Sequence, residues 1–117
     1  MSGRLKRAPS PPKHLSERAA AEWRRLGPLC IELRTLSRAN LRAFELLCNV
    51  LAAEGEARET LAKEGSLVKT AAGGSKPHPC LRAAEKATEQ SIKLLDMFEL
   101  NSEAPFPYDD DDDDDDE

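Results

Sequence analysis

Prolines divide this chain into segments, and their positions constrain which helices the chain can form. Pro11 and Pro12 precede one helical segment, and Pro77 and Pro79 precede the last one. Proline fits best just before a helix or in its first turn, because its φ is fixed and its missing N–H needs no partner there. The two proline blocks therefore bracket a long helical middle.

Local signals predict two short helices after the first block. Ser16 is a good N-cap, and Glu17 suits the first turn that follows it. Gly27-Pro28 is predicted to end this helix, with Pro28 opening a second one from Leu29 to about Leu36. Helical spacing is kept in the first segment by apolar residues: Leu15, Ala19, Ala20, Trp23 and Leu26.

A long helix is predicted from a cap at Ser37 to about Glu64, followed by Gly65 as its C-cap. It carries two apolar stripes: Leu41, Phe44, Leu47/Cys48 and Leu51 form one, and Ala43, Leu46, Val50, Ala53, Ala57 and Leu61 form the other. Two stripes indicate burial from two sides. The second partner is either another helix of the same domain or another subunit.

The next segment, 66–78, lacks helical periodicity, although its Leu67, Val68 and Thr70 favour a short strand or a hairpin arm. The last helix is predicted to run from Pro79 to about Asn101. We therefore predict an all-α fold with short N-terminal helices, one long central helix and a C-terminal helix. The predicted divisions are a disordered basic arm (1–13), a helical DNA-binding and oligomerisation domain (14–101, with a loop at about 65–78) and a disordered acidic tail (102–117).

The net charge of −5 conceals a strong charge asymmetry along the chain. Residues 1–42 hold ten basic and three acidic groups, whereas residues 109–117 hold nine acidic groups and no basic one. Phosphate contact by the basic third predicts DNA binding, since Lys and Arg displace condensed counterions. The alternative is a solvated basic surface. The candidate DNA-binding residues are Arg4, Lys6, Arg7, Lys13, Arg18, Arg24, Arg25, Arg34, Arg38 and Arg42.

Enzymatic chemistry finds little support in this chain. The two histidines, His14 and His78, stand beside prolines in segments expected to be exposed, and Ser37 and Ser91 have no evident His partner. His78 and Cys80 have no second ligand pair at zinc-site spacing, and Gly73-Gly74-Ser75-Lys76 lacks the spacing of a phosphate-binding loop. We expect no catalytic residue, no metal site and no cofactor.

The three cysteines, Cys30, Cys48 and Cys80, show no paired spacing, so we expect reduced thiols, with the first two in the core. We find no apolar run of about 20 residues and no secretory signal, and we expect no membrane partner. Small domains bury little surface, which favours self-association. The residues expected in the core or an oligomer interface are Trp23, Phe44, Leu47, Val50, Leu51, Leu61, Leu95 and Phe98.

The order of several motifs resembles the small terminase subunits of tailed bacteriophages, specifically the P27-like branch. These motifs are Pro-Pro-x-x-Leu at 11–15, Trp-Arg-Arg-Leu at 23–26, the long helix, Gly73-Gly74, Lys-Pro-His-Pro at 76–79 and Phe-x-Leu at 98–100. The resemblance implies a non-enzymatic subunit in the host cell cytoplasm that forms a ring-shaped homo-oligomer. It also implies binding to the packaging site on double-stranded viral DNA, and recruitment of the large terminase subunit that holds the ATPase and nuclease.

The chain departs from the family pattern at Asn40, where an acidic residue is common, and after Leu100, where an Arg-containing segment is common. The second departure favours the N-terminal arm as the DNA-binding element. The acidic tail permits three interpretations: a solubilising segment, a competitor that folds back on residues 4–42, or a docking segment for a basic partner. We favour the competitor.

Two alternatives to a terminase subunit remain open. The helix, Gly27 turn and short helix resemble a helix-turn-helix, which would suit a DNA-binding regulator. An adaptor that uses its acidic tail to bind a basic protein would not bind nucleic acid at all.

Overall fold

The computed structural model describes residues 3–100, and the predicted tail at 102–117 lies outside them. Within this range the fold is mostly helical, as predicted. Its elements in chain order are α1 (Glu17–Leu33), the 3₁₀ turn η1 (Arg38–Asn40), α2 (Leu41–Glu64), β1 (Leu67–Lys69), β2 (Ser75–Pro77) and α3 (Pro79–Met97).

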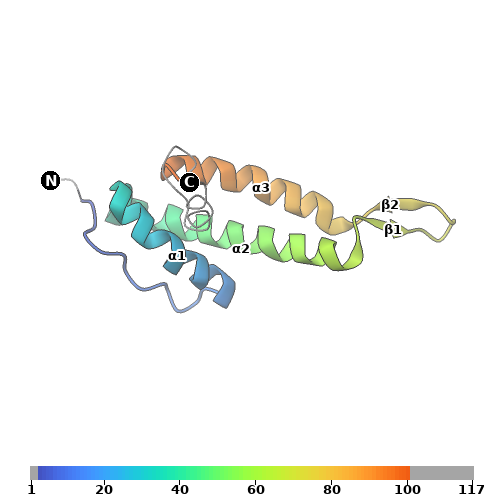
Figure 1. The fold of residues 1–117 in the computed structure, drawn as a ribbon, viewed down its shortest axis with the longest axis horizontal. Helices are drawn as coiled ribbons and strands as arrows, with labels where there is room; N and C mark the ends of the chain where they lie inside the picture. Colours follow the sequence, from blue (N-terminus) through green and yellow to red (C-terminus); the bar gives the residue numbers. More distant parts are fainter. Residues whose placement is uncertain (1–2, 101–117) are drawn as a thin grey trace, which may run out of the picture.

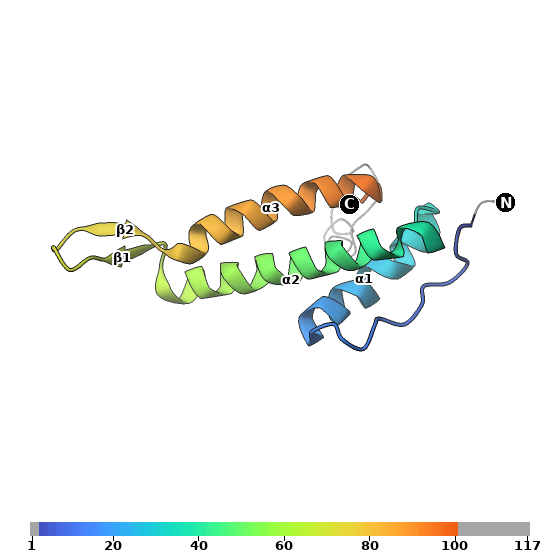
Figure 2. The ribbon, with the colours of Figure 1, turned by 180° about the vertical axis from the view of Figure 1, so that it is seen from behind.

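Helices α2 and α3 lie antiparallel along most of their length and form the long axis of the molecule (Figure 1). Helix α1 packs against the first part of α2 only, while β1 and β2 extend beyond the opposite end (Figure 2). We call the end where α1 packs the three-helix end, and the remainder of α2 and α3 the stem. The two ends of the molecule therefore differ in structure: three helices meet at one end, and the β1–β2 hairpin forms the other.

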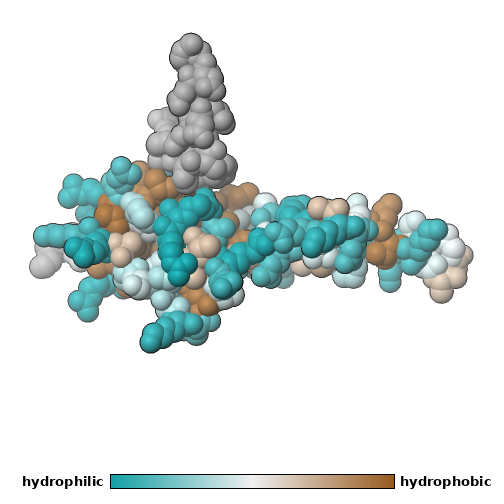
Figure 3. Space-filling view, turned by 60° about the horizontal axis from the view of Figure 1, so that its bottom comes forward, coloured by the Kyte–Doolittle hydropathy of each residue, from teal (hydrophilic) through white to brown (hydrophobic). Residues whose placement is uncertain are grey.

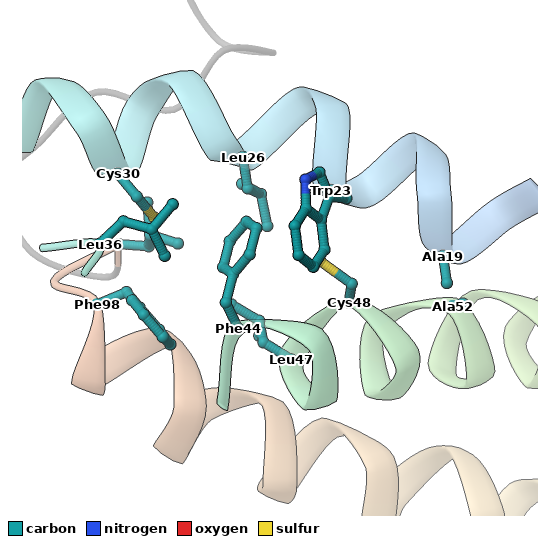
Figure 4. Close-up of a cluster of buried hydrophobic side chains, with 11 residues drawn as sticks. Ala19, Trp23, Leu26, Cys30, Leu36, Phe44, Leu47, Cys48, Ala52 and Phe98 are labelled. Atoms are coloured by element: carbon teal, nitrogen blue, oxygen red, sulfur yellow. The ribbon is translucent and has the colours of Figure 1, made fainter. Parts of the chain in front are cut away.

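The three-helix end is held together by aromatic rings. Phe44 lies between Trp23 and Phe98, with ring centroids 4.9 Å and 5.6 Å away and edge-to-face geometry in both pairs. Each such pair adds about 0.5–1.5 kcal/mol beyond the burial of its area. Figure 4 shows Leu26, Cys30, Leu36 and Cys48 among the side chains around these rings. Trp23 from α1, Phe44 from α2 and Phe98 after α3 therefore join all three helices in one core.

The predicted helix break at Gly27-Pro28 is wrong, because α1 continues through both residues to Leu33. Pro28 removes one helical N–H and its ring crowds the preceding turn, which normally disfavours this position. Leu26 and Cys30, on either side, are fully buried against the other helices. Their burial keeps the helix continuous, and the helix ends instead at Arg34, whose φ is 63°. The structure therefore contains no helix-turn-helix over residues 16–36.

Residues 3–13 lie along α1, where their composition predicts a flexible arm. Trp23 Nε1 donates to the carbonyl of Pro9 at 2.7 Å, and the Leu5 N–H donates to the carbonyl of Leu36 at 3.0 Å. Gly27 permits this approach, since a Cβ at that position would lie 2.9 Å from Cβ of Ala8. Composition did not reveal these contacts because they use backbone groups of the arm and a helical glycine.

The predicted boundaries of the long helix and the last helix are close to the observed ones. Ser16 caps α1 through a bond from the Ala19 N–H to its Oγ at 3.1 Å, and Gly65 ends α2 with a φ of 85°. The hairpin suggested by Leu67 and Val68 is present, with Val68 opposite Lys76 in an antiparallel pair.

His78 fixes the hairpin to the stem. Its side chain is buried, its Nδ1 accepts from the Cys80 N–H at 2.9 Å, and its Nε2 lies 2.7 Å from Glu64 Oε1. Because Nδ1 accepts, the ring proton sits on Nε2 and donates to the Glu64 carboxylate. His78 thus caps α3 and connects it to the end of α2.

Replacing the central ring should have the largest effect on stability. We expect Phe44→Ala to lower the free energy of unfolding by about 3–5 kcal/mol, because it leaves a cavity between Trp23 and Phe98. Phe44→Leu should cost about 1–2 kcal/mol, since more of the space stays filled. Leu67→Ala is the control, because Leu67 is 61% exposed. Urea denaturation at one protein concentration measures all three, and equal losses would contradict this role of Phe44.

Candidate nucleic-acid interface

The ten basic residues expected to contact DNA fall into groups that differ in what holds each side chain. Three are paired with carboxylates: Arg18 lies 2.6 Å from Glu59, Arg42 lies 3.4 Å from Glu45, and Arg25 pairs with Glu22 one turn earlier on α1. A phosphate would have to compete with these carboxylates. The paired arginines are therefore the weaker candidates for DNA contact.

Electrostatic effects on pKa are consistent with this pairing. The hydrogen bond from Arg18 lowers the pKa of Glu59 and raises the pKa of Arg18 itself. A hydrogen bond with His14, whose Nε2 lies 2.5 Å from Glu45 Oε2, lowers the pKa of Glu45, and Arg42 contributes to the same shift. These pairs also connect the arm and α1 to α2.

A second group borders the hollows between the arm and α1. Lys13 and Arg24 line one hollow together with Pro12, and Arg24 also lines the neighbouring hollow beside Trp23. Lys6 and Arg7 are exposed on the arm itself. Figure 3 shows hydrophilic side chains interspersed with hydrophobic ones at this end of the molecule. The docked arm therefore places its own cations beside those of α1.

A third group lies where α1 turns into α2, and we call it the arginine end: Arg4, Arg34 and Arg38. The arm reaches this turn through an antiparallel bridge between Arg4 and Ser37 and a bond from the Arg38 N–H to the carbonyl of Gly3 at 3.3 Å. Arg4 Nε donates to the carbonyl of Arg34 at 2.6 Å. Arg4 and Arg34 line a polar hollow with Glu99, which follows α3.

Among residues 3–100, no ion pair joins six of the candidate cations to a carboxylate: Lys6, Arg7, Lys13, Arg24, Arg34 and Arg38. All six are exposed. Exposed Lys and Arg side chains can follow a phosphate backbone without losing an internal partner. Within the described residues, the candidates therefore divide into exposed cations without an ion pair and cations engaged within the fold.

The eight apolar candidates divide by burial. Trp23, Phe44, Leu47 and Phe98 are buried in the core, so they are closed to a second subunit. The other four are half-buried: Val50, Leu51, Leu61 and Leu95. Three large apolar residues outside the predicted interface set are exposed on α2 and α3: Leu46 at 40%, Ile92 at 54% and Met97 at 54%. The first predicted stripe of α2 is buried or half-buried throughout, whereas Leu46 and Ala53 of the second stripe are exposed. The spacing of apolar residues does not show which side of a helix its neighbours cover.

The hairpin carries cations that were not among the ten candidates, because they lie outside the basic third of the chain. Lys69 and Lys76 are exposed on it, and Leu67 is 61% exposed. The local signal was Gly73-Gly74 between two short runs of extended residues, with Gly73 adopting a φ of 94°. Such a glycine pair predicts a turn, but it does not predict how far the hairpin extends beyond the ends of α2 and α3.

Chemistry at the cysteines is limited by burial. Cys30 and Cys48 are fully buried, as predicted, and burial raises the pKa of their thiols to about 11 and about 12. Across the described part of the chain, no group of three or more His, Cys, Asp or Glu residues is placed to hold a metal ion. No described helix is long and apolar enough to cross a membrane.

Comparison with known proteins identifies the family. The family model described as phage terminase, small subunit, matches residues 19–104. The match covers most of the chain, so the chain belongs to the small-subunit family of phage terminases. No curated protein and no solved structure matches it.

Alkylation tests the burial of the thiols. At pH 8, we expect iodoacetamide to modify Cys80 in the native chain but to spare Cys30 and Cys48, because reaction requires an accessible thiolate. In denaturant all three cysteines should react, and mass spectrometry counts the adducts. In a Cys80→Ser control, the native chain should take up no label. Native labelling of Cys30 or Cys48 at the rate of the unfolded chain would contradict the described core.

Proposed function

We propose that this chain is the DNA-recognition subunit of a phage genome-packaging terminase, of the P27-like branch. It acts without catalysing a reaction, in the cytoplasm of the host cell. It binds the packaging site on double-stranded viral DNA and recruits and regulates the large subunit, which supplies ATP hydrolysis and cleavage. Membership of the small-subunit family supports the packaging role.

The observation that carries DNA binding is the set of exposed cations on the arm and α1. Arg24 and Lys13 come from different segments but border one hollow, because Trp23 and Gly27 hold the arm against the helix. Contacts of this kind to phosphates fix the position of a protein on DNA without reading sequence. The arm and α1 together therefore form the proposed phosphate-binding surface.

A regulator of helix-turn-helix type is disfavoured, since α1 runs unbroken through Gly27 and Pro28. The adaptor that binds a basic protein remains the competing hypothesis. The adaptor hypothesis predicts that removing an exposed cation does not change the affinity for nucleic acid. A binding measurement therefore distinguishes the two hypotheses.

Two adjacent arginines of α1 provide a matched test. Arg24→Ala should weaken binding to double-stranded DNA and flatten the dependence of log K on log salt by about 0.9 for each phosphate that the variant no longer neutralises. Arg25→Ala should have a smaller effect, since Arg25 is already paired with Glu22. Fluorescence anisotropy over a salt series measures both, and circular dichroism checks that the helices persist. Unchanged slopes in both variants would favour the adaptor.

We further propose that the faces of α2 and α3 that α1 leaves uncovered carry the subunit interface of a ring-shaped homo-oligomer. Helix α1 covers only one side of α2, and Leu46 on α2 and Ile92 on α3 stay exposed. A head-to-tail interface closes into a ring when its rotation permits, whereas a two-fold interface gives a dimer. Exposed apolar side chains that α1 leaves uncovered are the surface available for either arrangement.

Solution mass tests the assembly. We expect multi-angle light scattering to give a closed ring of several subunits, well above a dimer. Ile92→Glu should lower the mass, because a carboxylate would be buried without a partner in the interface. Lys93→Glu, at the next and exposed position of α3, is the control for added negative charge. A monomer or dimer at high protein concentration in the unmodified chain would overturn the ring.

A further inference from the structure

The described chain ends beside the arginine end. Glu99 has a φ of 62°, and the N–H of Leu100 donates to the carbonyl of Leu95 at 2.9 Å. Leu100 is buried in the core. Glu99 lines the same hollow as Arg4 and Arg34. Everything that follows Leu100 is therefore tethered within reach of the arginine end, at the opposite end from the hairpin (Figure 1).

The sequence that follows has a complementary charge. Residues 109–117 carry nine carboxylates, and eight residues, 101–108, separate them from Leu100. Eight residues reach at most about 27 Å when fully extended. Helix α3 has 19 residues and is about 28 Å long. The tail carboxylates therefore reach the arginine end with the linker relaxed, whereas Asp109 reaches the hairpin only when the linker is almost fully extended.

We propose that residues 109–117 dock on the arginine end and compete there with DNA phosphate. Arg34 and Arg38 are exposed and have no carboxylate partner within residues 3–100, and Arg4 adds a third guanidinium beside them. Glu99 is the one carboxylate among the described residues that line the hollow, so cations outnumber it there. The docking follows from charge and tethering alone, while the competition rests on the proposed DNA-binding function.

Tethering makes the competition effective. A short link gives a second segment of the same chain an effective concentration of about millimolar. DNA must therefore displace the tail before it can contact the arginine end. Lys13 and Arg24 lie elsewhere, along the arm and α1, so contacts to them do not require this displacement. Since every duplex has the same phosphate spacing, the tail would weaken the phosphate contribution to specific and nonspecific binding by the same factor. Base contacts would then decide which sites still displace the tail.

Cross-linking tests the docking without DNA. A carbodiimide joins carboxylates to lysine amines. The tail of the full chain should therefore cross-link to Lys6, which lies two residues after Arg4 and so close to the arginine end. Mixing ¹⁴N-labelled and ¹⁵N-labelled chains separates links within one chain from links between chains. Arg34→Glu with Arg38→Glu should reduce the Lys6 links several-fold at low salt. Arg82→Glu with Lys86→Glu, exposed on α3, is the matched control and should leave them unchanged.

Binding tests the competition. A full-length variant with Asn at residues 109–116 and Gln at 117 should bind double-stranded DNA several-fold more tightly than the natural chain at about 50 mM salt, because the competitor has lost its charge. The gain should shrink at about 0.5 M salt, where the Debye length falls to a few ångströms. It should also shrink in the Arg34→Glu, Arg38→Glu background.

The outcomes separate this inference from the proposed function. Tail links spread evenly over Lys6, Lys69 and Lys76, or insensitive to Arg34→Glu with Arg38→Glu, would overturn the docking whatever the DNA result. Links at Lys6 without measurable DNA binding by either chain would support the docking and overturn the proposed function. Equal DNA affinity of the natural and neutral tails at low salt would overturn the competition.

Discussion

The contact of Phe44 with Trp23 and Phe98 is the interaction on which the described structure depends. One ring comes from each helix or its end, and the middle one has no exposed surface. Among residues 3–100, the three aromatic side chains all lie at this one place. The position of α1 on α2, and therefore of the arm on α1, follows from that stack. Within the described residues the stem has no comparable cluster of rings. The relative position of the helices is therefore fixed by aromatic packing at the three-helix end only.

The sequence predicted those parts of the fold that local chemistry decides. Ser16 was identified as a cap and Gly65 as a helix end because their side chains, or the lack of one, act on their own backbone. Gly27 and Pro28 were misinterpreted because the same local chemistry is outweighed there by burial of Leu26 and Cys30. Nothing in a single sequence gives the weight of that burial, since it depends on which helices meet.

The sequence predicts the region of the candidate interface, but it does not distinguish the exposed cations from those paired with carboxylates. Charge counting found the basic third of the chain, because the excess of Lys and Arg is visible in composition. It could not separate Arg24 from Arg25, since the difference lies in the pairing of Arg25 with Glu22. Nor could it place Lys13 beside Arg24, because their proximity arises from the bond between Trp23 and the carbonyl of Pro9.

The arm is held largely through its main chain, by the carbonyls of Gly3 and Pro9 and the N–H of Leu5. Main-chain groups are the same whichever side chain stands beside them. The arm can therefore exchange most of its side chains over evolutionary time and still lie along the same helix. A phage lineage could therefore alter the charge and shape that the arm presents while leaving the helical scaffold untouched.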